Sequence, residues 1–117
     1  MAVLEVNMPY IGRLLSVNYY KIRGRNGVQT NKTEPAVELW MTELASKVRG
    51  FQFGKTLTVE LEGHFKDGRV PDLHNLHKVI GDALSTGLQR NDKNFEFVDL
   101  SYGIGNVEPY LTIRLKE

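Results

Sequence analysis

The chain contains no cysteine, and this absence excludes several kinds of site. Without cysteine there is no disulfide scaffold, no thiolate-ligated zinc and no thiol nucleophile. No apolar run approaches the ~18 residues that a transmembrane helix needs. The first residues also lack the basic and then apolar order of a secretory signal peptide. We therefore expect a cytoplasmic protein with no membrane partner.

Acidic residues are missing from one long stretch near the N-terminus. Between Glu5 and Glu34 there is no carboxylate, but this interval contains Arg13, Lys21, Arg23, Arg25 and Lys32. The whole chain has a net charge of only +1, so positive charge is concentrated in this segment. Such asymmetry predicts an anionic partner at one end of the fold, and the alternative interpretation is a solvated loop.

The remaining composition is typical of one globular domain. The chain has 117 residues, no internal repeat and no low-complexity linker, so we expect a single domain over residues 1–117. Alternating apolar residues predict strands at 4–8, 57–65, 96–102 and 110–115. Residues 9–32 look irregular, with a brief strand near 27–30 as an alternative.

Apolar residues at helical spacing predict two amphipathic helices. The first has Thr33 as its N-cap and Pro35 in its first turn, and it runs to about Arg49. The second opens at Pro71-Asp72 and runs to about Gly87. This order of elements predicts an α+β fold, in which a small mixed sheet carries both helices on one face. The expected core comprises Trp40, Leu44, Leu57, Val59, Leu61, Leu73, Leu76, Ile80 and Leu84.

The start of the second predicted helix contains the residues best suited to chemistry. At ~100° per residue, His74, Asn75 and Lys78 lie opposite the apolar stripe, with Asp72 at the helix start. A positive helix end and a lysine favour an anion such as phosphate. A carboxylate and an imidazole can hold a metal ion.

Each of these residues also has a purely structural interpretation. Asp72 is then an N-cap, and His74 and His77 are surface or boundary residues. Lys78 points into solvent, and Asn91 and Asp92 are turn residues.

Taken together, these residues form a pattern that resembles the RusA family of Holliday-junction resolvases. The chain reads Pro71-Asp72-Leu73-His74-Asn75-Leu76-His77-Lys78, then Asp82-Ala83-Leu84, then Asn91-Asp92. The family signature is Asp-Leu-Asp-Asn-Leu-x-Lys, a helix and a further acidic pair. Asp72, Asn75, Leu76 and Lys78 match in register, and Asp92 matches the second acid of the pair if one residue is deleted near Gly87. Pro9, Ser16-Val17-Asn18 and Tyr20 also resemble the family's Pro…Ser-x-Asn…Tyr segment, so the resemblance covers most of the chain.

The chain departs from the family pattern at two positions. His74 stands where the pattern has its second aspartate, and Asn91 stands where it has the first acid of the later pair. The site therefore has two carboxylates fewer than the pattern. A nitrogen ligand shifts the preference from magnesium toward manganese or another transition ion.

The resemblance implies a homodimeric, divalent-metal-dependent endodeoxyribonuclease that acts in DNA recombination and repair. Such an enzyme resolves four-way DNA junctions by paired symmetric nicks. The alternative is a protein of the same fold that binds branched DNA without cleaving it, or that has a different branched-DNA specificity.

The resemblance also suggests roles for individual residues. Asp72, Asp92 and His74 would hold Mg2+, or Mn2+, and Lys78 would neutralise the phosphate. A helix followed by a return loop should bring the carboxylates of Asp72 and Asp92 together, so we rank these two above His74 as ligands. Asn75 and Asn91 would orient a ligand or a water. The expected DNA contacts are Arg13, Asn18, Lys21, Arg23, Arg25 and Arg69.

Overall fold

A four-stranded mixed sheet forms the frame of the molecule. The computed structural model describes residues 2–117, apart from the side chain of Gln29. The strand order is β1 (Val3–Pro9), β6 (Tyr110–Lys116), β4 (Leu57–His64) and β5 (Phe95–Gly103). β6 is antiparallel to both of its neighbours, whereas β4 and β5 run parallel. The predicted α+β fold is confirmed, and each of the four strands lies where the alternation placed it.

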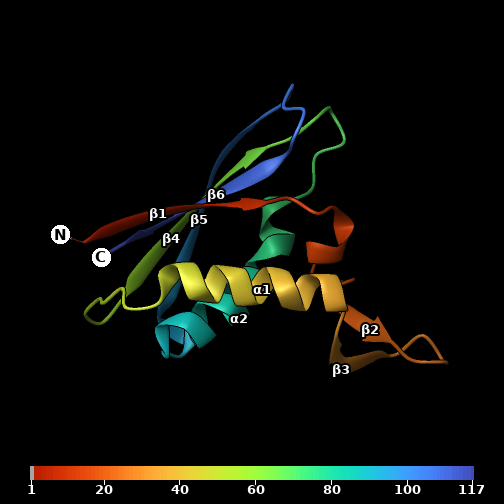
Figure 1. Ribbon diagram of the computed structural model, residues 1–117, viewed down its shortest axis with the longest axis horizontal. Coiled ribbons are helices and arrows are strands. Elements are labelled where there is room, and N and C mark those ends of the chain that lie inside the picture. Colours follow the sequence, from red (N-terminus) through yellow and green to blue (C-terminus); the bar gives the residue numbers. More distant parts are fainter. Residues whose placement is uncertain (1) are drawn as a thin grey trace.

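Two helices cover one face of this sheet, α1 (Pro35–Val48) and α2 (His77–Leu88) (Figure 1). Along β4, Leu57, Val59 and Leu61 are buried, and the residues between them are only partly covered. Every residue of the expected core is buried, which confirms the helix and strand phasing. Among the helices of the described residues, none has the length and hydrophobicity to span a membrane.

The two helix starts differ from the expectation in detail. α1 is preceded by Glu34 rather than Thr33 as its N-cap, and no side chain caps it. Pro35 occupies the first position, where its fixed φ suits a helix and its missing N–H costs nothing. The second helix opens as a 3-10 turn, η2 (Leu73–Leu76), before the α-helical part begins at His77. The sequence periodicity did not separate these two parts, because Leu73 and Leu76 are buried in either geometry.

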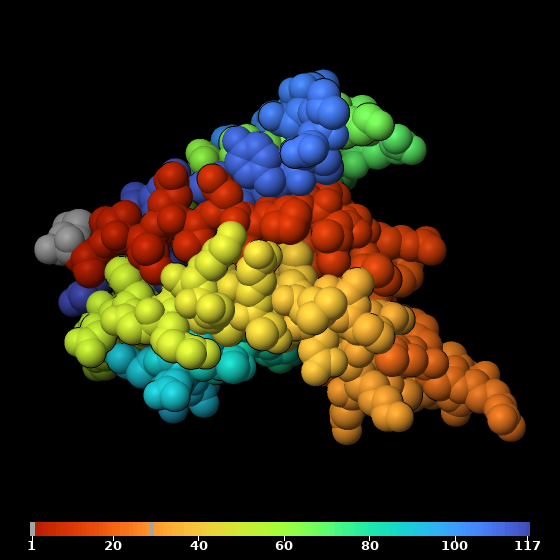
Figure 2. Space-filling view, in the orientation of Figure 1, coloured from red at the N-terminus to blue at the C-terminus, as the bar shows by residue number. Residues whose placement is uncertain are grey.

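The segment between β1 and α1 is more ordered than expected. It contains a 3-10 turn, η1 (Arg13–Leu15), and a separate two-stranded sheet of β2 (Lys21–Arg23) and β3 (Gln29–Thr33). The alternative of a strand near 27–30 is thus confirmed, although the strand begins at Gln29. It pairs with β2 and is not part of the main sheet. The end of the β2–β3 hairpin, coloured orange, projects from the body of the molecule on the side of the helices (Figure 2).

Candidate metal and phosphate site

Two adjoining pockets flank the 3-10 turn at the start of the second helix. The first has a volume of about 300 Å³ and is lined by Val17, His74, Asn75, His77, Lys78 and Asp92. The second has a volume of about 370 Å³, and its lining includes Arg13, Tyr19, Arg69, Asp72 and Asn75. Asn75 lines both pockets, so the residues predicted from the sequence are divided between two neighbouring hollows.

Asp92 reaches the first pocket because the chain reverses after α2. Gln89 ends the helix in the left-handed conformation, with φ of 55°. The side chain of Arg90 then donates hydrogen bonds to the backbone oxygens of Phe53 and Gly54, at 3.1 and 2.7 Å. These contacts hold the return loop against the loop that precedes β4. The loop leads into η3 (Asp92–Asn94), which brings Asp92 back beside the helix start.

The carboxylate of Asp92 rests against the body of α2. Its Oδ2 lies 3.7 Å from the place where a Cβ on Gly81 would be, so the missing side chain of this glycine leaves room for the carboxylate. Asn91, predicted to orient a ligand or water, is the N-cap of η3, and its Oδ1 accepts the Lys93 backbone N–H at 2.9 Å. The contacts of Asn91 are therefore those of its structural interpretation.

Asp72 has a structural contact of its own at the other end of the turn. Its Oδ1 accepts the backbone N–H of His74 at 3.0 Å, as an N-cap does. Its side chain lines the pocket of Arg13 and Arg69, whereas Asp92 lines the pocket of His74 and Lys78. The return loop thus joins Asp92 with His74, but Asp72 is not gathered with them into one group of three ligands within residues 2–117.

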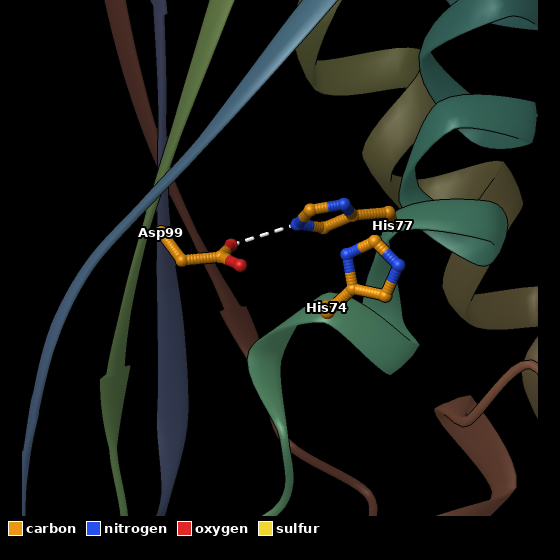
Figure 3. A group of neighbouring side chains, drawn as sticks. All are labelled: His74, His77 and Asp99. Atoms are coloured by element: carbon orange, nitrogen blue, oxygen red, sulfur yellow. Dashed lines mark hydrogen bonds and ion pairs between the residues drawn. The ribbon is translucent and has the colours of Figure 1, made fainter.

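The three ligating side chains that are gathered are His74, His77 and Asp99 (Figure 3). One ligand atom of each lies within 4.8 Å of the other two. His77 Nε2 is 2.7 Å from Asp99 Oδ1, and the centroids of the two imidazole rings are 4.7 Å apart. His74 and Asp99 are exposed, and His77 is partly covered.

Sequence reasoning missed the part that His77 and Asp99 play in this group. A 3-10 turn has about three residues per turn, so side chains at i and i+3 lie in line, as His74 and His77 do. Asp99 follows Phe95 and Phe97 at strand spacing, on the side of the sheet that faces α2. A carboxylate at a position where this alternation predicts an apolar residue was a signal for Asp99 that the sequence did contain.

Lys78 stands beside this group on the exposed surface. Its Nζ donates a hydrogen bond to Asp82 Oδ1 at 3.2 Å, and its side chain is 53% exposed. The Tyr20 hydroxyl donates to the other oxygen of Asp82 at 3.2 Å. Burial of the phenol, together with the Asp82 charge, raises the pKa of Tyr20 to about 12. An exposed i, i+4 ion pair contributes little stability, so the Lys78 ammonium can leave Asp82 for a phosphate at small cost.

The basic residues of the β2–β3 hairpin divide into two kinds. Lys21 Nζ donates to the Asn31 backbone oxygen and to Thr33 Oγ1, and the Arg23 guanidinium donates to the backbone oxygens of Asn18 and Gly27. These two side chains brace the hairpin itself. Arg25 is exposed, and among residues 2–117 its side chain makes no hydrogen bond or ion pair. It is therefore available to an anion from solvent.

Arg13 and Arg69 lie together around the second pocket. The Arg13 guanidinium carbon is 5.3 Å from the centroid of the Tyr19 ring. Arg69 pairs with Asp67 at 2.8 Å, and its hydrogen bond lowers the pKa of the Asp67 carboxyl to about 2. The side chain of Arg69 is nevertheless 88% exposed. Both guanidinium groups can therefore meet an anion from solvent.

No protein-family model matches this chain, and no curated protein matches it either.

The donor atoms of the gathered group indicate which kind of ion they fit. Mg2+ prefers an octahedral set of oxygen ligands. The gathered group offers two imidazole nitrogens and one carboxylate, and Asp72 and Asp92 line different pockets. The donor set of the gathered group therefore does not fit Mg2+.

Proposed function

We propose that the protein is a divalent-metal-dependent endonuclease that cuts four-way DNA junctions. The observation that supports this proposal best is the pocket in which Asp92, from the return loop, meets His74, Asn75 and Lys78, from the start of the second helix. Carboxylate and imidazole groups are metal ligands, and a lysine ammonium neutralises phosphate. Asn75, Lys78 and Asp92 also match the resolvase pattern in sequence, whereas His74 departs from it.

The residues around this pocket suit a DNA backbone. Lys78 neutralises the phosphate that enters the first pocket, and Arg13 and Arg69 bind a neighbouring phosphate at the second. Tyr19 is exposed next to Arg13, so its ring can stack on an unpaired base at the branch point. Arg25 extends the basic surface along the projecting hairpin, and Asn18 lies at its base.

A four-way junction has two-fold symmetry, so we propose that a two-fold dimer acts on it. Two copies of the pocket would then meet strands of the same polarity and make paired nicks. The resemblance in sequence implies Mg2+, with Mn2+ as its alternative, whereas the gathered group favours a transition metal ion. The carboxylates of Asp72 and Asp92 are the oxygen ligands to test for Mg2+. Because the described residues do not gather these carboxylates with His74, we assign no step of the reaction to Mg2+.

The decisive experiment is a cleavage assay on an end-labelled four-way junction, with a panel of divalent metals and a linear duplex of the same sequence as control. We expect two symmetric nicks in the junction and none in the duplex. Sedimentation in the same buffer should give a dimer. Failure to nick with every metal would contradict the proposal, as would equal cutting of the duplex.

A second candidate is a protein that binds branched DNA without cleaving it. It is favoured by the contacts of Asp72, whose carboxylate caps the helix start and is not gathered with Asp92. This candidate predicts a junction-specific band shift in a gel without any nick, whatever the metal. The same assay therefore separates the two functions.

A further inference from the structure

We infer that His74, His77 and Asp99 form a binding site for a transition metal ion of the zinc or cobalt class. The three ligand atoms lie within 4.8 Å of one another and come from η2, α2 and β5. Only the role of this ion in DNA cleavage rests on the proposed function; binding of the ion does not. The site itself can be tested without DNA.

The spacing of the ligand atoms is close to that of a metal site. His77 Nε2 and Asp99 Oδ1 are 2.7 Å apart, which is a hydrogen-bond distance. Two ligands at ~2.0–2.1 Å from a tetrahedral ion are separated by about 3.3 Å. An ion can therefore replace the shared proton after the two side chains move apart by about half an ångström. His74 then needs only a side-chain rotation, because it is exposed and its ring is already next to that of His77.

The site is built by packing as well as by proximity. The His77 ring stacks on Phe97, with centroids 4.4 Å apart and planes 17° from parallel. Phe97 lies two residues before Asp99 on β5, so one stretch of strand orients the imidazole and supplies the carboxylate. The side chains of His77 and Asp99 are only 18% and 32% exposed. A ligand that is held in place loses little conformational entropy when the ion binds.

The identity of the donors selects the class of ion. Imidazole suits zinc, copper, iron and nickel, whereas Mg2+ and Ca2+ take oxygen ligands. Three protein ligands with one open position are also typical of catalytic rather than structural zinc. His74 and His77 line the same pocket as Lys78 and Asp92, so a phosphate oxygen or a water that enters this pocket is the natural fourth ligand.

The chain offers a matched control for this inference. Its three histidines are His64, His74 and His77. His64 lies on β4, where its ring stacks on Tyr110 at 4.2 Å and its Nε2 is 3.1 Å from Thr112 Oγ1. His64 is therefore an imidazole in a similar stacked setting that does not belong to the gathered group.

The test is a titration of the metal-free protein with Co2+, followed by its visible absorption, and with Zn2+, followed by calorimetry. We expect one ion per chain, and we expect millimolar Mg2+ not to displace it. Removal of a residue that only hydrogen-bonds to a metal ligand lowers metal affinity by about 10- to 100-fold. Removal of a ligand itself, in His74→Ala, His77→Ala or Asp99→Asn, should therefore lower metal affinity by more than about 100-fold. His64→Ala should bind as the wild type does.

A second measurement covers the case in which His77→Ala disturbs the packing on Phe97. Zn2+ should raise the melting temperature of the wild type and of His64→Ala, but not that of His74→Ala or Asp99→Asn, neither of which removes the ring that stacks on Phe97. Equal Co2+ binding by wild type, His74→Ala and Asp99→Asn would overturn the inference, and so would the absence of binding in the wild type. Metal binding without junction nicking would instead count against the proposed function alone.

Discussion

The two sides of the four-stranded sheet each place a histidine ring against an aromatic ring, and they differ in what surrounds the pair. On the open side, His64 stacks on Tyr110 and contacts the hydroxyl of Thr112. On the helix-covered side, His77 stacks on Phe97 and contacts the carboxylate of Asp99. Of these two histidines, only His77 belongs to a group of three side chains that could hold a metal ion, among the residues 2–117 that the structure describes.

The charged side chains on the open side already form ion pairs with one another. Arg114 pairs with Glu5, Glu60 and Glu62, and Lys116 pairs with Glu60 as well. On the covered side, the partner of Asp99 is an imidazole rather than a guanidinium. Stacking on an aromatic ring therefore does not distinguish the two histidines. What distinguishes His77 is a carboxylate without a permanent cation, together with a second imidazole, that of His74.

The largest expected effect is on catalysis. Asp92→Asn and Asp72→Asn should each lower the rate of junction nicking by at least about 1,000-fold, because each removes a proposed metal ligand. Asparagine is as good an N-cap as aspartate, so Asp72→Asn keeps the helix start intact. Junction binding should stay or tighten, since one negative charge near phosphate is removed. Single-turnover nicking and gel shifts measure these two quantities.

The control for this prediction is Glu62→Gln, which removes a carboxylate from the open side of the sheet. It should nick at the wild-type rate. Wild-type nicking by Asp72→Asn and Asp92→Asn would show that these two carboxylates take no part in cleavage.

The next largest effect is on stability. Leu61 is fully buried against the helices, so Leu61→Ala should lower the free energy of unfolding by about 2–5 kcal/mol. Its neighbour Glu62 faces the open side and pairs with Arg114 at 3.6 Å. Glu62→Ala should therefore cost less than about 1 kcal/mol. Urea unfolding of the two variants measures the contrast, and equal losses would contradict the assignment of the two faces.

A smaller effect shows from which side DNA approaches. Arg25→Gln should reduce the slope of log affinity against log salt by about 0.9, the value for a single phosphate neutralised by the protein. Combined neutralisation of Lys21, Arg23 and Arg25 should reduce it by roughly one unit for each phosphate that is no longer neutralised. Lys116→Gln, on the open side, should leave the slope unchanged. A lower slope for Lys116→Gln alone would place the DNA on the open face instead.

The smallest effect is a difference in pH dependence. Hydrogen bonds from Lys116 and Arg114 lower the pKa of Glu60, so its contribution to stability is present above the unfolded pKa and is lost as pH falls through the folded value. The pKa of Tyr20 is raised to about 12, so its contribution is complete below about pH 10 and is lost as pH rises toward 12. Urea unfolding should show a flatter acid limb for Glu60→Gln and a flatter alkaline limb for Tyr20→Phe. The reverse assignment of the two limbs would contradict both pKa directions.

Much of the fold followed from side-chain periodicity alone. The alternation along β4 and the helical spacing along α2 identified the buried residues correctly, because burial of an apolar face requires that spacing in any context. The β2–β3 hairpin was predicted less well from the sequence. Its strands are short and polar, and the braces from Lys21 and Arg23 to distant backbone oxygens leave no periodic pattern.

The candidate site was predicted in part. The return loop was expected to bring the carboxylates of Asp72 and Asp92 together. It brings Asp92 into the pocket of His74 and Lys78, and Asp72 lines the neighbouring pocket. The partners of His74 could not be found in that way. Asp99 reaches the two histidines through the pairing of β5 with β4, which joins segments far apart in the chain.

The order of apolar and polar residues was enough to determine the α+β class, the core and the polar start of the second helix, because these depend on neighbours a few positions away. The tertiary structure alone decided that β5 pairs with β4 in parallel and presents Asp99 to His77. Partner and register of a strand are set by contacts between segments far apart in the chain. His77 and Asp99 are 22 residues apart, and no local pattern encodes their meeting.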